Sequence, residues 1–299
     1  MIITRLIGGL GNQMFQYAAG AALAARTGQA LRLDLTSLRK YKLHQGYQFD
    51  QIFAGDFQTA SKLDLFRVLG FGMRRGVRGS VTPDPRLPNP QTGPKIRQPS
   101  HNYWDGFSAL SGKTYLAGYW QSPKYFQGAE AAIARAFEFR EDLTGENAEI
   151  AAKMAACTSV SLHVRRGDYV KNANVNAIHG ICDWPYYRAA MAHMRAALHA
   201  PQFFVFSDDL DAAKAEFGQG ADITYVTGNT GAVSYRDMML MARCKHHVIA
   251  NSSFSWWGGW LALAHGAADD GQIVIAPKVW FAGSPEPMED IYQPHWVRM

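Results

Sequence analysis

Residues 8–18 read GGLGNQMFQYA and follow at once on the apolar run IITRLI at residues 2–7. The apolar run predicts a strand, and the alanine-rich residues 12–26 predict a helix that Gly28 can end. Residues 30–35 (ALRLDL) then alternate as a strand does. A strand, a helix and a second strand in this order form a β-α-β unit, whose strands pair in parallel. The sequence therefore begins with an α/β domain.

The second half of the chain repeats this rhythm, because compact apolar runs alternate with predicted helices. Such runs are typical of a parallel sheet that is covered on both faces. We place a domain boundary near residues 141–154, which predicts domains at 1–152 and 153–299. Ser234 and Asp237 predict a capping box at the start of one helix. The predicted strands are SVSLHV (159–164), QFFVF (202–206), HHVIA (246–250) and IVIA (273–276), and the predicted helices span 184–198, 234–244 and 253–265.

The composition excludes several classes of protein. The formal net charge of +5 at pH 7 is a mild excess, which ordinary surface lysine and arginine produce and which also suits an anionic ligand or an acidic membrane surface. No lysine-rich tract of nucleic-acid type is present, so we expect no nucleic-acid partner. Cys157, Cys182 and Cys244 fit neither a zinc ligand set nor a disulfide framework, and they indicate a reducing compartment.

Residues 61–100 are rich in glycine, proline and arginine and predict an interrupted helix followed by a long loop. The plain interpretation is a solvated insertion. The alternative is a peripheral contact with a membrane through the basic, partly apolar residues 66–97. No apolar run is long enough to span a bilayer, and the first strand leaves no room for a signal peptide before it.

The opening junction partly matches a dinucleotide-binding fingerprint. Gly9-Leu10-Gly11 follows a strand and Asp34 lies about twenty residues further on, but Met14 stands where the third glycine belongs. An NAD(P)-dependent oxidoreductase is therefore one alternative. Tight turning alone does not require Asn12 and Gln13, and a glycine-rich loop that opens a helix directs N–H groups toward an anion or a polar ligand.

Two further polar stretches follow predicted strands. In HVRRGDY (163–169), one arginine can grip a phosphate with two parallel hydrogen bonds while the other pairs structurally, for example with Asp168. In FSDDLD (206–211), a carboxylate can accept from a base or a ribose hydroxyl. Asp209-Leu210-Asp211 also has the spacing of a metal-binding D-x-D, and Ser207 or Asp208 can cap a helix.

The last stretch, ANSSFSWWGGWL at residues 250–261, places hydroxyls before a predicted helix. Asn251, Ser252 and Ser253 are each good helix caps, so a structural role explains any one of them. Three hydroxyls and a helix N-terminus together also suit a pyrophosphate.

Taken together, these stretches resemble the inverting α-1,2-fucosyltransferases of glycosyltransferase family 11. The resemblance covers nearly the whole chain except residues 61–102, and it implies a GT-B architecture, with two Rossmann-like α/β domains facing across a cleft. Residues 1–152 would take the acceptor side and residues 153–299 the donor, with the last helix able to pack back on the first domain. The matching motifs, in order, are GGLGNQMFQYA, GYWQSPKYF, SLHVRRGDYV, FVFSDD and CKHHVIANSSFSWWGGWL.

The resemblance also implies the reaction: fucose passes from GDP-fucose to the 2-hydroxyl of a terminal β-galactoside, with no cofactor and no metal ion. Arg165 would bind the donor phosphates, His163 would lie near the nucleotide, and Asp209 would read guanine. Asn251, Ser252, Ser253 and Ser255 would hold the pyrophosphate, and the loop with Gly9, Gly11, Asn12 and Gln13 would approach the fucose and the β-phosphate.

The general base is the least determined part of this reaction, and Asp168 is the nearest candidate for it. A structural partner for Arg166 is the competing role of that carboxylate. Animal members of the family carry an N-terminal membrane anchor and stem. Because neither is present, the chain resembles the bacterial members that act in the cytoplasm on surface-glycan precursors, and we expect it there or at the inner face of the membrane. A non-catalytic glycan-binding module is a further alternative.

Overall fold

The computed structural model divides into two compact units. Unit 1 comprises residues 1–140 and 289–292, and unit 2 comprises residues 141–288 and 293–299. None of the helices in the described part of the chain is long and apolar enough to cross a membrane. The structure describes residues 1–40, 45–72, 94–166, 180–283 and 286–299.

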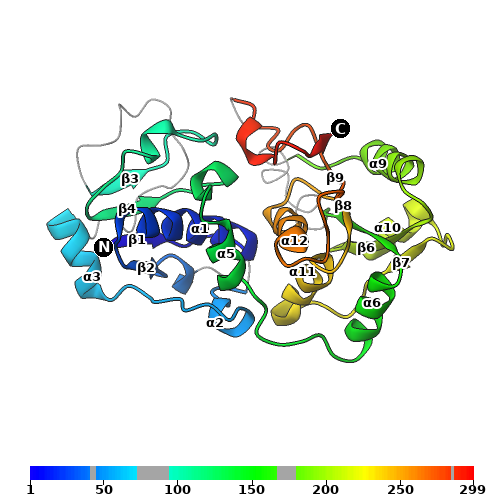
Figure 1. Cartoon of the computed structure of the whole chain (residues 1–299), viewed down its shortest axis with the longest axis horizontal. Coiled ribbons are helices and arrows are strands. Elements are labelled where there is room, and N and C mark those ends of the chain that lie inside the picture. Colours follow the sequence, from blue (N-terminus) through cyan, green and yellow to red (C-terminus); the bar gives the residue numbers. More distant parts are fainter. Residues whose placement is uncertain (41–44, 73–93, 167–179, 284–285) are drawn as a thin grey trace. The chain divides into compact units, whose positions relative to one another are not determined.

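Unit 1 is built on a parallel sheet in the order β2-β1-β4-β3 (Figure 1). The predicted β-α-β opening is confirmed, and Gly28 ends the first helix in the left-handed region at φ 63°. Strands and helices of this unit are β1 (Ile2–Arg5), α1 (Leu10–Thr27), β2 (Leu31–Asp34), α2 (Phe49–Ile52), α3 (Lys62–Leu69), β3 (Lys95–Arg97), β4 (Thr114–Ala117) and α5 (Glu130–Ala136), with short 3-10 turns η1 (Leu38–Lys40), η2 (Gly70–Gly72), η3 (Asp105–Phe107), η4 (Pro123–Phe126) and η6 (Glu289–Ile291).

The two faces of this sheet bury alternate residues, as the two-residue period of a strand requires. Ile2 and Leu116 pack with Leu23 of α1 on one face. On the other face, neighbouring strand residues pack under α3. The sheet is therefore covered on both sides, and its polar groups collect at its edges and strand ends.

Unit 2 holds a larger parallel sheet in the order β10-β9-β8-β5-β6-β7 (Figure 1). The predicted strands and helices of the second half are confirmed in type and order. All the elements of unit 2 in the described residues, including some that were not predicted, are α6 (Glu146–Ala155), β5 (Thr158–Val164), α9 (Trp184–Ala197), β6 (Pro201–Ser207), α10 (Leu210–Phe217), β7 (Ile223–Tyr225), η5 (Gly231–Val233), α11 (Tyr235–Met241), β8 (His246–Val248), α12 (Ser253–Ala264), β9 (Val274–Ala276) and β10 (Val297–Arg298).

Strand β5 shows how this core is divided. Val160, Leu162 and Val164 face one hydrophobic cluster, which includes Tyr187 and Met191 of α9. The alternate positions carry serine and histidine, and the neighbouring strand β6 packs its own alternate residues with α6 and α11. One face of β5 is thus apolar and the other polar, although both are buried.

Two expectations about boundaries differ from the structure. The division falls after Arg140 rather than after residue 152, because Ile150 and Met154 of α6 pack in the core of unit 2. The capping box at Ser234 is wrong: η5 runs directly into α11, so Ser234 is itself helical and its side chain makes no capping bond. Asp237 instead accepts a hydrogen bond from Asn229 Nδ2 at 2.8 Å.

Candidate active site

The carboxyl ends of β8, β5 and β6 are neighbours at one edge of the unit 2 sheet. These three strands are adjacent and parallel, so the segments that follow them emerge side by side. The segments are residues 165–166, 208–209 and 249–253, and they hold most of the polar residues that the sequence singled out. Ligands of open α/β sheets bind outside such an edge.

His163 lies near the end of β5 and is almost fully buried, with 7% of its surface exposed. Burial, and then the positive charge of Arg165, lower the pKa of His163 to about 4. The imidazole is therefore neutral at pH 7. Its Nδ1 has no hydrogen-bond partner among the described residues, and its ring centroid lies 6.1 Å from that of Phe254 in α12. A buried, neutral, unpaired ring nitrogen is suited to a ligand group that can hydrogen-bond to it.

The two adjacent arginines have different surroundings. The Arg166 guanidinium stacks on the Trp184 ring at 4.4 Å, and its backbone N–H donates to Asp208 Oδ1 at 2.8 Å. Arg165 is close enough to His163 to affect its pKa. The sequence predicted that one arginine binds the ligand and the other is structural. The contacts of Arg166 agree with the structural role. Asp168 lies outside the described residues, so its predicted role is untouched.

Asp209 caps α10, since its Oδ1 accepts from the backbone N–H of Ala212 at 3.2 Å. The sequence had offered Ser207 or Asp208 for this position. Ser207 Oγ accepts from the Asp209 N–H at 3.0 Å, and Asp208 holds the backbone of Arg166. Among the residues that the structure describes, no group of three or more histidine, cysteine, aspartate or glutamate side chains could hold a metal ion.

Asn251 ties together parts of unit 2 that are distant in sequence. Its Nδ2 donates to the carbonyls of Gly180 and Trp280, each at 3.2 Å. Its Oδ1 accepts from the Cys182 thiol at 3.4 Å. These contacts hold the chain beside the N-terminus of α12, so this side chain supports the site through the backbone.

The three serines that follow, Ser252, Ser253 and Ser255, differ in their burial and in their hydrogen bonds. Ser252 caps α12, because its Oγ accepts from Phe254 N–H at 3.3 Å. Ser255 is 2% exposed and donates to the Ser252 carbonyl at 3.3 Å. Ser253 is half-buried at the first position of the helix. The hydroxyls of Ser252 and Ser255 are thus engaged within the first turn of α12 itself.

In unit 1, the opening loop ends at Gly9, the N-cap of α1, which makes no side-chain capping bond. Asn12 stands in the first turn, and its Oδ1 accepts from Gln121 Nε2 at 2.7 Å. Gln13 is fully buried and donates to the carbonyls of Gly8 at 2.9 Å and Gly46 at 3.0 Å. Of the two polar side chains, Asn12 is the more accessible and Gln13 holds the loop in place.

The surroundings of Asp34 argue against the alternative of a dinucleotide-binding oxidoreductase. Its carboxylate is 1% exposed and accepts from the Tyr115 hydroxyl at 2.6 Å and from Thr36 N–H at 2.9 Å. A carboxylate engaged in this way inside unit 1 has no room to bind ribose hydroxyls. Asp34 is a structural residue that ties β2 to β4.

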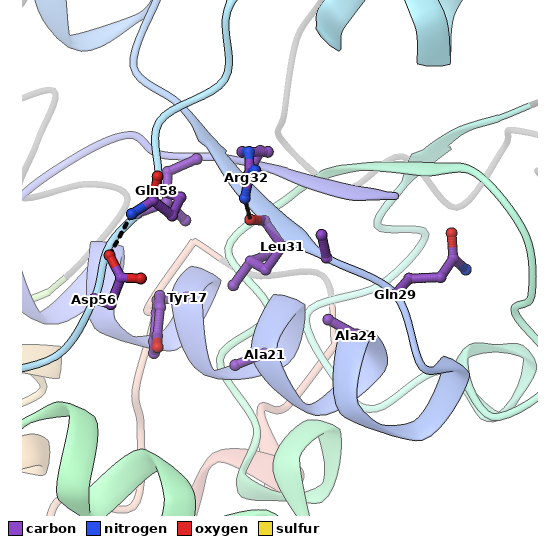
Figure 2. A pocket seen from close by; sticks show the side chains of 10 residues that line it. Tyr17, Ala21, Ala24, Gln29, Leu31, Arg32, Asp56 and Gln58 are labelled. Carbon is purple, nitrogen blue, oxygen red and sulfur yellow. Dashed lines mark hydrogen bonds between the residues drawn. The ribbon is translucent and has the colours of Figure 1, made fainter.

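A hollow of about 310 Å³ lies beside α1 and β2. Figure 2 shows the side chains that line it, among them Tyr17, Ala21 and Gln58. It contains none of the predicted site residues. Its lining combines three alanines with larger side chains and with residues of β2. The hollow is therefore separate from the strand ends that carry the chemistry.

The comparisons with known proteins concern the chain as a whole and identify its family. Residues 100–299 match the family model for glycosyl transferase family 11. An Escherichia coli alpha-1,2-colitosyltransferase is 35% identical over 100% of this chain and 99% of its own. Human galactoside alpha-(1,2)-fucosyltransferase 1 is 28% identical over 49% of this chain and 42% of its own. The crystal structure of fucosyltransferase NodZ from Bradyrhizobium aligns with a TM-score of 0.50 and 16% identity, over 86% of this chain and 91% of that one.

Two parallel α/β units with this likeness show a fold of the GT-B type, as the sequence predicted. The chain belongs to glycosyl transferase family 11. The expected cleft between the two units stays a prediction.

One polar residue of the site was missed by the sequence reasoning. Gln121 was part of a matching motif, GYWQSPKYF, but no chemistry was assigned to it. Its bond to Asn12 joins positions 109 residues apart. The signal available in the sequence was the single polar amide inside an otherwise aromatic stretch.

Proposed function

We propose that this chain transfers fucose from GDP-fucose to the 2-hydroxyl of a terminal β-galactoside, with inversion and release of GDP. The observation that carries the proposal is the edge of the unit 2 sheet, where Arg165, the neutral His163 and the N-terminus of α12 follow neighbouring strands. The human relative, named for the same linkage and sugar, supports it.

The proposed chemistry follows from the charges at this edge. The acceptor hydroxyl attacks the anomeric carbon, and the bond to the β-phosphate breaks, so negative charge grows on the leaving GDP. Arg165 and the backbone N–H groups of α12 stabilise that charge. A general base must take the proton of the hydroxyl, and Asp168 is our candidate for it.

The nucleotide would be held by side chains of the same edge. A carboxylate has two oxygens, so Asp209 can cap α10 through Oδ1 and accept from a guanine N–H through the other. His163 supplies an unpaired ring nitrogen near Arg165. Ser253 and the first N–H groups of α12 would receive the pyrophosphate.

A second donor is favoured by one specific finding, the 35% identity to an alpha-1,2-colitosyltransferase over the whole chain. Colitose is fucose without the 3-hydroxyl, so the same site could accept either sugar. A site that hydrogen-bonds the 3-hydroxyl would reject the sugar that lacks it, because its polar groups would be left unpaired.

The deciding experiment supplies GDP-fucose and GDP-colitose separately, each with a panel of galactosides, and determines the linkage of each product by NMR. We expect fucose at the 2-hydroxyl, with a higher kcat/KM for GDP-fucose. A preference for GDP-colitose would reassign the donor, and hydrolysis or transfer of neither sugar would reject the proposal.

We also propose that transfer needs no metal ion, because the cationic role falls to Arg165 and a helix N-terminus. Activity should then persist in EDTA. Loss of activity in EDTA and its recovery with manganese or magnesium would instead assign a metal to the Asp209-Leu210-Asp211 stretch.

A contact with an anionic membrane surface is the last part of the proposal. Residues 66–97 carry seven lysine and arginine residues and one aspartate, so their net charge, seven minus one or +6, exceeds the net charge of +5 of the whole chain. In the described part of this stretch and the adjoining turn of α3, Phe71, Phe66 and Leu63 are 100%, 45% and 55% exposed. Exposed apolar groups beside positive charge favour binding to acidic lipids.

Cosedimentation with vesicles tests this contact. We expect binding to vesicles that contain phosphatidylglycerol, weak binding to pure phosphatidylcholine, and a loss of binding in Phe66→Ser. Equal binding to both vesicles, or none to either, would contradict it.

A further inference from the structure

The hydrogen bond between Gln121 and Asn12 fixes the direction in which both amides face. Gln121 Nε2 donates to Asn12 Oδ1 at 2.7 Å. An amide carries its acceptor and its donor on opposite sides, so this bond turns the Asn12 NH₂ group away from Gln121. That group lies over Gly8, where a Cβ atom would be only 2.7 Å from Nδ2. Glycine at position 8 and glutamine at 121 thus hold one orientation of Asn12.

The other end of the Gln121 amide is buried as well. The residue is 3% exposed, and its Oε1 has no hydrogen-bond partner among the described residues. Leaving a buried carbonyl unpaired destabilises a protein, so such a group calls for an explanation in function. The hydroxyls of a sugar are the donors that this acceptor lacks.

The backbone that presents Gln121 is held in a strained turn. Trp120 adopts φ 55°, a left-handed conformation that costs energy for a residue with a side chain. Gln98 Oε1 accepts from the N–H groups of Tyr119 at 2.8 Å and Trp120 at 2.9 Å. Gly118 allows this approach, because a Cβ there would lie 2.4 Å from the Gln98 Cβ. Strain kept by such support is characteristic of functional sites.

The Trp120 side chain anchors this turn in the core of unit 1. It is fully buried, and its ring lies 5.6 Å from Phe107 and 5.1 Å from Tyr125. Because Trp120 points into the core, the turn directs the next side chain toward the N-terminus of α1. Gln121 is therefore placed by packing and by hydrogen bonds.

We propose that Gln121 is a positioning residue of the transfer reaction, which orients the Asn12 amide through Nε2 and accepts a hydrogen bond from a sugar hydroxyl through Oε1. The hydroxyl belongs to the donor sugar or to the acceptor galactoside. The inference rests on the proposed function, because it gives the opening loop a reaction to serve.

Two substitutions separate the two parts of this role. Gln121→Glu keeps acceptor oxygens but cannot donate to Asn12 Oδ1 as a carboxylate, and Gln121→Met keeps the length of the side chain and removes both polar groups. We expect both variants to lower kcat about 10- to 100-fold, and only Gln121→Met to raise the KM of a sugar substrate as well. If Gln121→Met raises the KM of lactose, the hydroxyl belongs to the acceptor. If it raises the KM of GDP-fucose and slows the hydrolysis of GDP-fucose in the absence of an acceptor, the hydroxyl belongs to the donor sugar.

The matched control is Thr114→Val, which removes a buried hydroxyl from the opposite end of the strand that leads to Gln121. It should lower the melting temperature slightly and leave kcat unchanged. A double substitution then tests whether Gln121 acts through Asn12. In the Asn12→Ala background, Gln121→Glu should lower kcat at most 3-fold.

Three results would overturn the inference. Parental kcat and KM in both Gln121 variants would show that the amide is only structural. An undiminished cost in the Asn12→Ala background would show that Gln121 does not act through Asn12. A parent enzyme that turns over neither GDP-fucose nor GDP-colitose would instead reject the proposed function, and this inference with it.

Discussion

Two helices, α1 in unit 1 and α12 in unit 2, begin at the carboxyl edge of a parallel sheet, but their N-termini are built differently. The N-cap of α1 is Gly9, which has no side chain to bond the N–H groups of the first turn. The N-cap of α12 is Ser252, whose hydroxyl accepts from Phe254 N–H. The polar partner of α1 comes from elsewhere in the chain, since Gln121 bonds Asn12.

This difference indicates two kinds of sensitivity to substitution. At α12, the capping residue Ser252 contributes to the helix as well as to the proposed pyrophosphate site, so its substitution should change stability as well as binding. At α1, the polar side chain in the first turn is held from outside the helix. Changes there should alter the reaction with a smaller effect on folding.

The largest expected effect is at Arg165, beside α12. Arg165→Lys keeps the charge but loses the two-pronged grip on phosphate. We expect kcat to fall about 10²- to 10³-fold, the usual cost of losing one preorganised donor. Steady-state kinetics with GDP-fucose and lactose provide the measurement.

Arg166→Lys is the matched control for this substitution. Its guanidinium stacks on Trp184, a contact that lysine keeps only in part, so stability should fall slightly while kcat changes less than about 10-fold. Similar rates for the two variants would show that both arginines, or neither, contact the donor.

Acid should act strongly on unit 2. Burial lowers the pKa of His163 to about 4 and that of His247 to about 3, below the ordinary value of 6.5. Their stabilising contribution is complete above pH 6.5 and is lost as the pH falls toward 4, because the unfolded chain binds protons that the folded unit excludes. Each histidine accounts for up to about 3 kcal/mol by pH 4.

The variant His247→Asn checks this assignment. Ser161 Oγ lies 2.7 Å from His247 Nδ1, and asparagine can replace that nitrogen without titrating. The melting temperature of the variant should decline less steeply than that of the parent between pH 6.5 and 4. Parallel curves would mean that other groups govern the response to acid.

Asn12→Ala tests the α1 side of the comparison. Affinity for GDP should change by less than about 1 kcal/mol, the worth of one neutral hydrogen bond. Turnover should fall about 10-fold or more, because the proposed contacts strengthen as the bond to GDP breaks. Calorimetry of GDP binding beside turnover gives both numbers, and a proportional loss of both would move the nucleotide toward unit 1.

The smallest effect is expected at the cap of α12. Ser252→Ala should lower the free energy of unfolding by about 1 kcal/mol, because it removes a capping bond. Ser253→Ala leaves that capping bond in place, so it should lower stability less than Ser252→Ala does and should weaken GDP binding. Denaturant unfolding of both variants will compare them, and equal losses of stability would remove the distinction between the two serines.

The strands and helices could be predicted because their signals are local. The apolar runs of unit 2 and the glycine at position 28 each act within a few residues, and the structure has them as expected. The capping box predicted at Ser234 was wrong because the preceding 3-10 turn η5 runs directly into the helix. A local motif cannot reveal what the residues before it do.

The partners of the site residues could not be predicted in this way. Gln121 and Asn12 are 109 residues apart, and Asn251 donates to a carbonyl 71 residues away. Such pairs are set by how the strands are ordered in the sheet. The sequence therefore located the polar strand ends, and only the fold distinguishes the half-buried Asn12 from the fully buried Gln13.

The chain passes between the two units three times, because residues 289–292 belong to unit 1 although their neighbours belong to unit 2. Asp290 accepts from the Tyr103 N–H at 2.9 Å and pairs with Lys124. A chimera that joined residues 1–140 of one family member to 141–299 of another would combine Asp290 of one parent with the partners of the other. A chimera that exchanges donor specificity should therefore take residues 141–288 and 293–299 from the second parent and keep residues 289–292 from the first.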